Sequence, residues 1–330
     1  MSATGRPTVL LIGGTGRSGS TLLDRLLGEL PGFVAVGELR YIWSEALGEN
    51  RYCGCGARFL DCSFWSRVGS QAFGGWDRID SSQVMAQERS IGRHRHIPLL
   101  AMGRAAPARY ARRLDDYLGS LGPMYDAIRD VSGADVIVDS TKDAAYAHVL
   151  RRMRGADFRV VHLVRDSRGV AWSWAKVVQS DPEHYMRRFS PRVTALRWVG
   201  YNLMVESLGR FGIPRLLLRY ESLVENPQAA LTAVASFAGR PLDPGSLAFL
   251  EGKSASLRTH HTVAGNPMRM TAGQIGLALD EAWRTNMPFA QRAQVTALTW
   301  PLLRHYAQSG RSRRGNAENL PTALEGADGR

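Results

Sequence analysis

Five short apolar runs, rich in β-branched residues and leucine, recur along the chain, and each is followed by a turn signal and then by a helical pattern. This alternation is typical of an α/β protein with a mostly parallel sheet. The runs lie at residues 9–12, 33–36, 135–138, 160–164 and 216–218. The pattern therefore predicts an α/β fold in which helices flank a parallel sheet.

A long segment, residues 42–133, separates the second run from the third and is rich in arginine and aromatic residues, with helical stretches such as 107–121. A connection of this length predicts a subdomain or lid rather than a loop. A further helical region is expected over 274–306. The polar, charged residues 309–330 predict a disordered tail, so residues 1–308 are expected to form a single domain.

The string GTGRSGSTLL, residues 14–23, directly follows the first apolar run. A strand, a glycine-rich turn and a helix start in this order predict a P-loop-like cradle for a phosphate or sulfate, because backbone N–H groups and the helix dipole face the anion. The spacing of Gly14, Gly16 and Gly19 fits the dinucleotide fingerprint, with the acid Glu38 about 20 residues on. It also fits Gly-x4-Gly, but Ser20 replaces the lysine of an ATP-binding loop. The loop alone leaves the family open.

Polar residues follow every one of the five predicted strands. Ligands of open α/β sheets bind outside the carboxyl ends of the strands, so these side chains are expected to meet in one anion-binding cleft. They are Arg17 and Ser18 after the first strand, Glu38 after the second, Asp139 to Lys142 after the third, Arg165 to Arg168 after the fourth, and Arg219 to Glu221 after the fifth.

The chain carries a formal net charge of +12 and has a pI near 10.2, which indicates an anionic partner. No zinc-finger, RNP or helix-turn-helix motif accompanies the charge, so no nucleic-acid partner is predicted. The first residues, MSATGRP, run directly into the first strand without a signal-peptide apolar region. A cytoplasmic protein with no transmembrane segment is expected.

Three cysteines, Cys53, Cys55 and Cys62, fall in one short segment, and their odd number excludes a full disulfide framework. With His94 or His96 they would offer four zinc ligands, but the Cys-x-Cys spacing departs from the usual Cys-x2-Cys. We expect thiols that pack in a loop and no metal site, with zinc as the open alternative.

The glycine-rich string together with VVHLVRDSRGVAWSW, which contains the fourth strand, resembles the two cofactor-binding segments of sulfotransferases that use 3′-phosphoadenosine 5′-phosphosulfate (PAPS). The resemblance implies that Arg165 and Ser173 hold the 3′-phosphate, the group that distinguishes this cofactor from ATP and NAD. It implies that the 5′ sulfate-bearing phosphate is cradled by Gly16, Arg17, Ser18, Gly19, Ser20 and Thr21.

Further segments extend this resemblance along the chain. VDSTK is similar to a segment of the carbohydrate and tyrosylprotein branches, which implies that Lys142 faces the transferring group. VGELR is similar to the segment that carries a catalytic glutamate, here Glu38. RYESLVENP implies that Tyr220 neighbours the nucleotide, and HHTVAGNPMR that Asn266 and Arg269 close over the phosphates.

Sulfuryl transfer resembles phosphoryl transfer, an in-line displacement that depends on positioning and on stabilising charge at the leaving oxygen. The resemblance therefore implies that Lys142 and Arg17 supply cations, and that Glu38 takes the proton of the acceptor hydroxyl, with His260 and His261 as the next candidates. Arginines would neutralise the phosphates without a divalent metal.

The expected acceptor is a hydroxyl of a small molecule, a glycan or a lipid. Residues 42–133 are expected to build its pocket, where the aromatic rings of Tyr41, Trp43, Trp65 and Trp76 would stack on a sugar or aryl ring. Two other functions remain open: an NAD(P)-dependent oxidoreductase that uses the GxGxxG loop, and a basic binding protein. The segment from Arg165 to Ser173 separates the first alternative, because hydride transfer has no use for a 3′-phosphate site.

Overall fold

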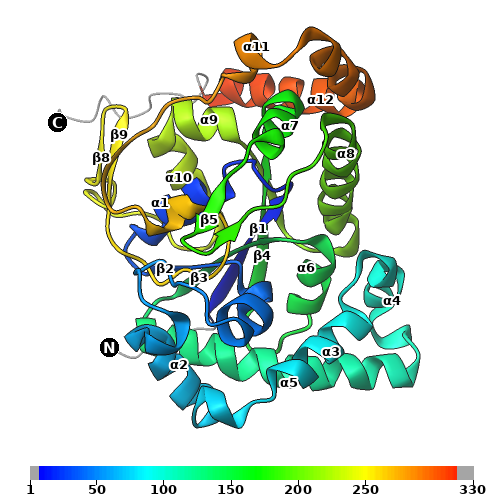
Figure 1. Ribbon diagram of the computed structural model, residues 1–330, viewed down its shortest axis with the longest axis vertical. Helices are drawn as coiled ribbons and strands as arrows, with labels where there is room; N and C mark the ends of the chain where they lie inside the picture. Colours follow the sequence, from blue (N-terminus) through cyan, green and yellow to red (C-terminus); the bar gives the residue numbers. More distant parts are fainter. Residues whose placement is uncertain (1–6, 318–330) are drawn as a thin grey trace, which may run out of the picture.

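The computed structural model describes residues 7–317 of the chain. A five-stranded sheet with the strand order β2-β3-β1-β4-β7 lies at its centre, and every neighbouring pair of strands is parallel (Figure 1). The strands are β1 (Thr8–Gly14), β2 (Phe33–Gly37), β3 (Val136–Lys142), β4 (Asp157–Val164) and β7 (Arg215–Arg219). The five predicted strands and the α/β fold class are confirmed.

Helices cover both faces of the sheet, as the alternating contacts of β1 show. Val9 and Leu11 belong to a core shared with α6 (Ala144–Leu150) and with the long segment after β2, whereas Leu10 and Ile12 belong to a second core. Helices α1 (Ser20–Gly28), α9 (Tyr220–Glu225) and α10 (Pro227–Phe237) supply that second core. Because both faces are buried, each strand appears in the sequence as a nearly continuous apolar run, and these runs predicted the strands.

The long segment forms a helical layer at one end of the molecule, drawn in blue to green tones at the bottom of Figure 1. Its helices are α2 (Ser63–Phe73), α3 (Ser81–Ile91), α4 (Ile97–Met102) and α5 (Ala108–Ser132), preceded by a π-helical turn, Ile42–Gly48. Both α2 and α3 pack against α5, and their buried side chains join the core of the sheet. The segment therefore extends the main core instead of building one of its own.

Three further helices complete the layers: α7 (Ser167–Ala175), α8 (Pro191–Ser207) and α12 (Phe289–Ala317), of which α7 and α12 both pack against α8. Short strands β5 (Gln179–Asp181) and β6 (His184–Tyr185) form a hairpin. In the late part of the chain, β8 (Leu250–Glu251), β9 (Ser254–Leu257) and β10 (Gly273–Gly276) form a small antiparallel sheet.

The structure differs from the sequence-based expectation in the last hundred residues. The predicted helical region 274–306 begins as strand β10, because its glycine-flanked backbone pairs with β9, and becomes helical only at α11 (Trp283–Asn286). Helix α12 then continues through residues 309–317, where a disordered tail was expected, since adding residues to an existing helix costs little. Residues 318–330 lie outside the described part of the chain.

None of the helices within residues 7–317 combines the length and the apolar character that crossing a membrane requires.

Candidate functional site

The carboxyl ends of all five parallel strands open onto one cavity of about 380 Å³. The register explains the convergence, since β1 ends beside the ends of β3 and β4, and β4 ends beside β7. The predicted site residues that line the cavity are Gly16, Arg17, Gly19, Ser20, Thr21, Glu38, Lys142, Arg165, Ser173, Tyr220 and Asn266. All five strand ends thus contribute to a single cleft, but the expectation that every polar strand-end residue lies in it is wrong, because Asp166, Arg168, Arg219 and Glu221 line a separate pocket.

The glycine-rich turn adopts a backbone that side chains would obstruct. Gly19 has a φ of 91°, and a Cβ placed on it would lie 2.4 Å from the ring of Tyr220. A Cβ on Gly16 would lie 2.7 Å from the ring of Trp174, whose Nε1 donates a hydrogen bond to the carbonyl oxygen of Gly16 at 3.0 Å. Because α1 begins at Ser20, its N-terminal N–H groups and dipole face the cavity.

Arg17 presents unsatisfied hydrogen-bond donors at this turn. Its Nε and Nη2 atoms are buried and have no hydrogen-bond partner among the described residues, and its guanidinium lies 5.3 Å from the centre of the Trp174 ring. Burial lowers the pKa of Arg17, although the nearby charge of Glu38 opposes this effect. Buried donors without acceptors are costly, so this arrangement favours an anionic ligand.

Ser18 lies behind the cavity rather than on its wall. Its side chain is 1% exposed, and its Oγ likewise lacks a partner within residues 7–317. The structure therefore brings Ser18 next to the predicted anion site but does not place it among the lining residues.

Lys142 and Glu38 meet across the ends of β3 and β2. The Lys142 Nζ lies 2.5 Å from Glu38 Oε1 and donates a hydrogen bond to the carbonyl oxygen of Ser140 at 2.7 Å. Lys142 has a φ of 72°, a left-handed conformation that a non-glycine residue adopts only when its surroundings enforce it.

Buried Asp139 shapes the turn that carries this lysine. Its Oδ1 accepts hydrogen bonds from the Thr141 backbone N–H at 2.9 Å and from the Thr141 hydroxyl at 2.5 Å, and its Oδ2 accepts one from the Tyr125 hydroxyl at 2.6 Å. Burial raises the pKa of Asp139 to about 6, against the opposing effect of these hydrogen bonds. The carboxyl group thus fixes the chain just before Lys142.

Arg165 connects the fourth strand end to the glycine-rich turn. Its guanidinium donates to the carbonyl oxygen of Arg17 at 3.2 Å and to Asp280 Oδ2 at 3.1 Å, and it lies 4.6 Å from the centre of the Tyr220 ring. Burial alone would raise the pKa of Asp280, but the hydrogen bond from Arg165 and its charge lower it. Asp280 therefore lies against Arg165 as a carboxylate.

Two predicted residues belong to the loop between β9 and β10, called the late loop, but only one of them lines the cavity. Asn266 lines the cavity and accepts a hydrogen bond from the backbone N–H of Met268 at 3.1 Å. Arg269 does not line it: its guanidinium donates to the carbonyl oxygens of Ser180, Gly265 and Tyr52. Arg269 therefore does not lie where it was expected to close over phosphates: both Nη atoms donate to backbone carbonyl oxygens, and its buried Nε has no partner among the described residues.

The tryptophans expected to contact the acceptor lie in the core instead. Trp43 and Trp65 are fully buried and Trp76 is 9% exposed, all three within the cluster that joins the long segment to the sheet. The ring–ring contacts among them and nearby phenylalanines account for their burial. Tyr41 alone of the four predicted aromatics lines the cavity.

The histidines considered as alternative bases or metal ligands also have other partners. His260 Nε2 lies 2.7 Å from Glu29 Oε1, and His94 Nε2 lies 2.9 Å from Asp143 Oδ2. His261, rather than His94 or His96, lies beside the three cysteines. Neither His260 nor His261 lines the cavity, so the structure does not support either as a base.

Sequence reasoning missed a wall of the cavity that α8 provides. Arg197 and Tyr201, four residues apart on this helix, both line it, and the Arg197 guanidinium lies 4.4 Å from the centre of the Phe189 ring. The i, i+4 spacing of a cation and an aromatic ring was the available signal. The argument from strand ends could not predict this wall, because only tertiary packing brings α8 to the cleft.

A second cavity of about 450 Å³ adjoins the first and shares Tyr41, Asp143 and Tyr201 with it. Its other lining residues lie between residues 40 and 94 and are mostly polar or basic: Arg40, Ser44, Met85, Glu88, Arg89, Arg93 and His94. Together the two cavities form a cleft with the glycine-rich turn at one end and a separate compartment beside it.

Comparison with known proteins identifies the family of this chain. A model described as the sulfotransferase family matches residues 7–244. The chain is similar in structure to the sulfotransferase domain of the Synechococcus PCC 7002 olefin synthase, with 20% identity, coverage of 92% of this chain and 97% of that chain, and a TM-score of 0.48. It is also similar to the sulfotransferase domain from the curacin biosynthetic pathway, with 15% identity, coverage of 91% and 98%, and a TM-score of 0.47. A comparison with curated protein sequences gives no match.

The match to the family model includes the glycine-rich turn, all five strands of the parallel sheet and the long helical segment. Because the matched residues make up well over half of the sequence, the chain belongs to the sulfotransferase family.

Proposed function

We propose that this protein transfers a sulfuryl group from PAPS to a hydroxyl acceptor. The observation that carries the proposal is the arrangement of Arg17, Lys142 and Glu38 around one cavity, with buried guanidinium donors that lack partners within the described chain beside a lysine–carboxylate pair. This set provides cations for a developing negative charge and a carboxylate for a proton. Membership of the sulfotransferase family supports the same chemistry.

The cofactor would lie along the strand ends. The glycine-rich turn and the N-terminus of α1 would hold its 5′ phosphate and sulfate through Gly16 to Thr21, where the unpartnered donors of Arg17 need an anion. Arg165 and Ser173, which line the same cavity, would hold the 3′-phosphate. Asp280 would have to release Arg165 for this contact, since its carboxylate now accepts from that guanidinium.

The reaction needs charge stabilisation and a proton acceptor. When bound, PAPS supplies the sulfuryl group; Lys142 and Arg17 stabilise the charge that develops on the leaving phosphate oxygen. Glu38 accepts the proton of the acceptor hydroxyl at one of its carboxylate oxygens. The contact with Lys142 orients this carboxylate toward the cavity.

The acceptor would enter through the second cavity, whose residues Tyr41 and Tyr201 also line the cavity that holds the Lys142–Glu38 pair. This compartment supports the expectation that the long segment after β2 helps to build the acceptor site. Its size suits a small molecule or one end of a glycan or lipid that carries a free hydroxyl.

A transfer assay tests the proposal. The protein is incubated with PAPS labelled in its sulfuryl group and with separate sets of sugar, aryl and aliphatic alcohols. We expect label on at least one alcohol class, with stoichiometric release of adenosine 3′,5′-bisphosphate. NAD(P)-dependent oxidation of the same alcohols with no label transferred would instead favour an oxidoreductase.

A further inference from the structure

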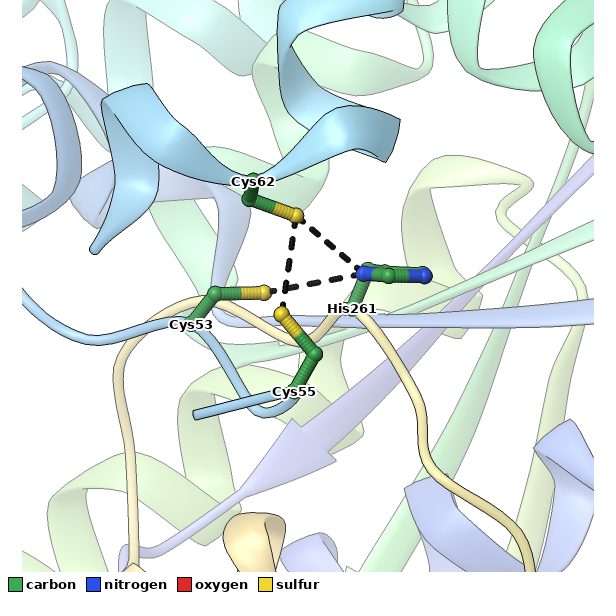
Figure 2. Close-up of side chains that lie close together, drawn as sticks. All are labelled: Cys53, Cys55, Cys62 and His261. Carbon is green, nitrogen blue, oxygen red and sulfur yellow. Dashed lines mark hydrogen bonds between the residues drawn. The ribbon is translucent and has the colours of Figure 1, made fainter. Parts of the chain in front are cut away.

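Three cysteine sulfurs and one histidine nitrogen converge beside β2, outside the residues that line either cavity (Figure 2). Cys53, Cys55 and Cys62 come from the loop that precedes α2, whereas His261 comes from the late loop after β9. The three Sγ atoms and a ring nitrogen of His261 all lie within 4.8 Å of one another. Cys53 and Cys62 are each 1% exposed, and all three thiols are free.

Three of the six distances between these ligand atoms are close to the edges of a tetrahedron around a metal ion. Zinc bonds of about 2.3 Å to sulfur and about 2.0 Å to nitrogen place ligand atoms about 3.5–3.8 Å apart. The Cys55 and Cys62 sulfurs are 3.7 Å apart, and His261 Nδ1 lies 3.2 Å from Cys62 Sγ and 3.9 Å from Cys53 Sγ. Figure 2 shows the four side chains pointing toward a common centre.

The protein fixes the orientation of the histidine independently of the cysteines. The ring of Phe64 stacks on the imidazole with 5.0 Å between ring centres and 7° between planes. The indole Nε1 of Trp65 donates a hydrogen bond to the His261 carbonyl oxygen at 2.9 Å. Phe64 and Trp65 lie in the first turn of α2, which Cys62 immediately precedes, so the same turn presents a sulfur and positions the imidazole.

The backbone also accounts for the unusual Cys-x-Cys spacing. The intervening Gly54 donates its N–H to the Thr262 carbonyl oxygen at 2.9 Å, and a Cβ on it would lie 2.7 Å from the carbonyl oxygen of His260. Only glycine allows the two loops to approach this closely. The close approach sets Gly54, the residue between Cys53 and Cys55, against the backbone of His260 and Thr262, the two neighbours of His261.

We propose that Cys53, Cys55, Cys62 and His261 bind a structural zinc ion. On binding, the three thiols release their protons to solvent and the neutral imidazole contributes the lone pair of Nδ1, with no change of oxidation state. Four protein ligands close the coordination sphere, which is typical of structural and not of catalytic zinc. The proposal replaces the expectation that these thiols only pack in a loop.

The ion would anchor the late loop beside the catalytic candidates. Two residues after His261, Val263 pairs with Gly37, and its carbonyl oxygen accepts the N–H of Glu38 at 2.9 Å. A Cβ on Gly265 would lie 2.8 Å from Glu38 Oε1, and the next residue, Asn266, lines the cavity. Zinc would thus hold the segment that flanks Glu38 against the edge of the sheet.

The test uses the full chain, produced without a histidine tag and purified under reducing conditions. We expect elemental analysis to find about one zinc per chain, as a four-ligand site requires. Replacing zinc by Co²⁺ should give the visible absorption of tetrahedral cobalt with thiolate ligands. Removing the metal with a strong chelator should lower the melting temperature, and zinc should restore it.

Variants assign the ligands. His261→Ala and Cys62→Ser should lose the metal, whereas His261→Cys, which keeps a zinc ligand at the same position, should retain it. His305→Ala is the matched control, because this half-exposed histidine lies on α12, far along the chain from the cluster, and should leave the zinc content unchanged. If His261→Ala fails to fold, the cobalt spectra of the wild type and of His261→Cys still show whether the metal binds at this cluster.

Three outcomes would overturn the proposal: wild-type protein with far less than one zinc per chain and no cobalt spectrum after reconstitution, a disulfide among the three cysteines in the reduced preparation, or full zinc content in His261→Ala. Because metal content and spectra are independent of the transfer assay, failure of the zinc site and failure of the proposed function are distinguishable.

Discussion

The ammonium group of Lys142 lies 2.5 Å from the Glu38 carboxylate, which links the end of β3 to the end of β2 at the bottom of the cleft. Both side chains are largely buried, each with 13% of its surface exposed, so water screens this pair only partly. The proximity has a functional consequence: removing either group changes the charge that the other one faces.

Replacing Lys142 by alanine should lower the turnover number by roughly 10²–10³, because a cation that stabilises the transition state is lost. Nucleotide affinity should change much less. Lys253→Ala, at an exposed turn between β8 and β9, is the control and should retain wild-type turnover. Near-normal turnover of Lys142→Ala on any accepted alcohol would show that this lysine is only structural. The measurement is the steady-state rate of label transfer from PAPS.

Glu38→Gln should lower turnover by about 10²–10⁴ if Glu38 accepts the hydroxyl proton, since the amide keeps the shape but cannot act as a base. Turnover as a function of pH is the informative measurement, with the exposed Glu251→Gln as control. The low-pH limb of the profile should disappear in Glu38→Gln. An unchanged rate and an unchanged pH profile would move the role to another residue.

Arg165→Ala should weaken the binding of adenosine 3′,5′-bisphosphate by about 1.5–3 kcal/mol, the range for a hydrogen bond to a charged group. The affinity for adenosine 5′-phosphate, which lacks the 3′-phosphate, should change little. Because Arg165 also donates to the Arg17 carbonyl oxygen, a general loosening of the glycine-rich turn would weaken both nucleotides equally. Equal losses of binding free energy for the two nucleotides in calorimetric titrations would therefore reject the 3′-phosphate assignment. Arg210→Ala, at an exposed position, is the control for the change in net charge.

The stability of the protein should depend on the protonation of His148, which lies fully buried in α6. Neither ring nitrogen has a hydrogen-bond partner in the described part of the chain, and burial, assisted by the charge of Arg151, lowers its pKa from 6.5 to about 4. Between these pH values the unfolded chain binds a proton that the folded chain does not. The free energy of unfolding should therefore fall as the pH drops from 6.5 to 4, by at most on the order of 3 kcal/mol from this group.

His148→Leu removes this proton-binding group and should make the variant gain stability relative to wild type as the pH falls through that interval. Urea unfolding at several pH values measures the difference. Parallel pH dependences for wild type and His148→Leu would contradict the assignment.

The sequence was sufficient for the sheet and for most of the cleft. Strands buried on both faces appear as apolar runs, and parallel strands bring their carboxyl ends to one edge, so residues as distant as Arg17 and Tyr220 could be assigned to one site. The same geometry did not predict which strand-end residues turn away from the cleft: Asp166, Arg168, Arg219 and Glu221 line a separate pocket.

Contacts that depend on loops or on helix packing could not be predicted in this way. His261 meets Cys62 across 199 residues because the late loop pairs with the edge of β2, and no local pattern specifies that pairing. Arg269 turns to backbone carbonyl oxygens instead of the cavity for a similar reason, since the position of those carbonyls is set by three separate segments. Arg197 reaches the cleft only because α8 packs across the sheet.

Calorimetric titration of the wild-type protein with adenosine 3′,5′-bisphosphate, adenosine 5′-phosphate and NAD tests the central claim most directly. If the cleft is a PAPS site, the bisphosphate should bind at one site per chain and tighter than adenosine 5′-phosphate by about 10-fold or more, the equivalent of a charged hydrogen bond to its 3′-phosphate. NAD should bind weakly or not at all. Bisphosphate binding no tighter than that of adenosine 5′-phosphate, together with saturable binding of NAD, would contradict the assignment of the cleft to PAPS.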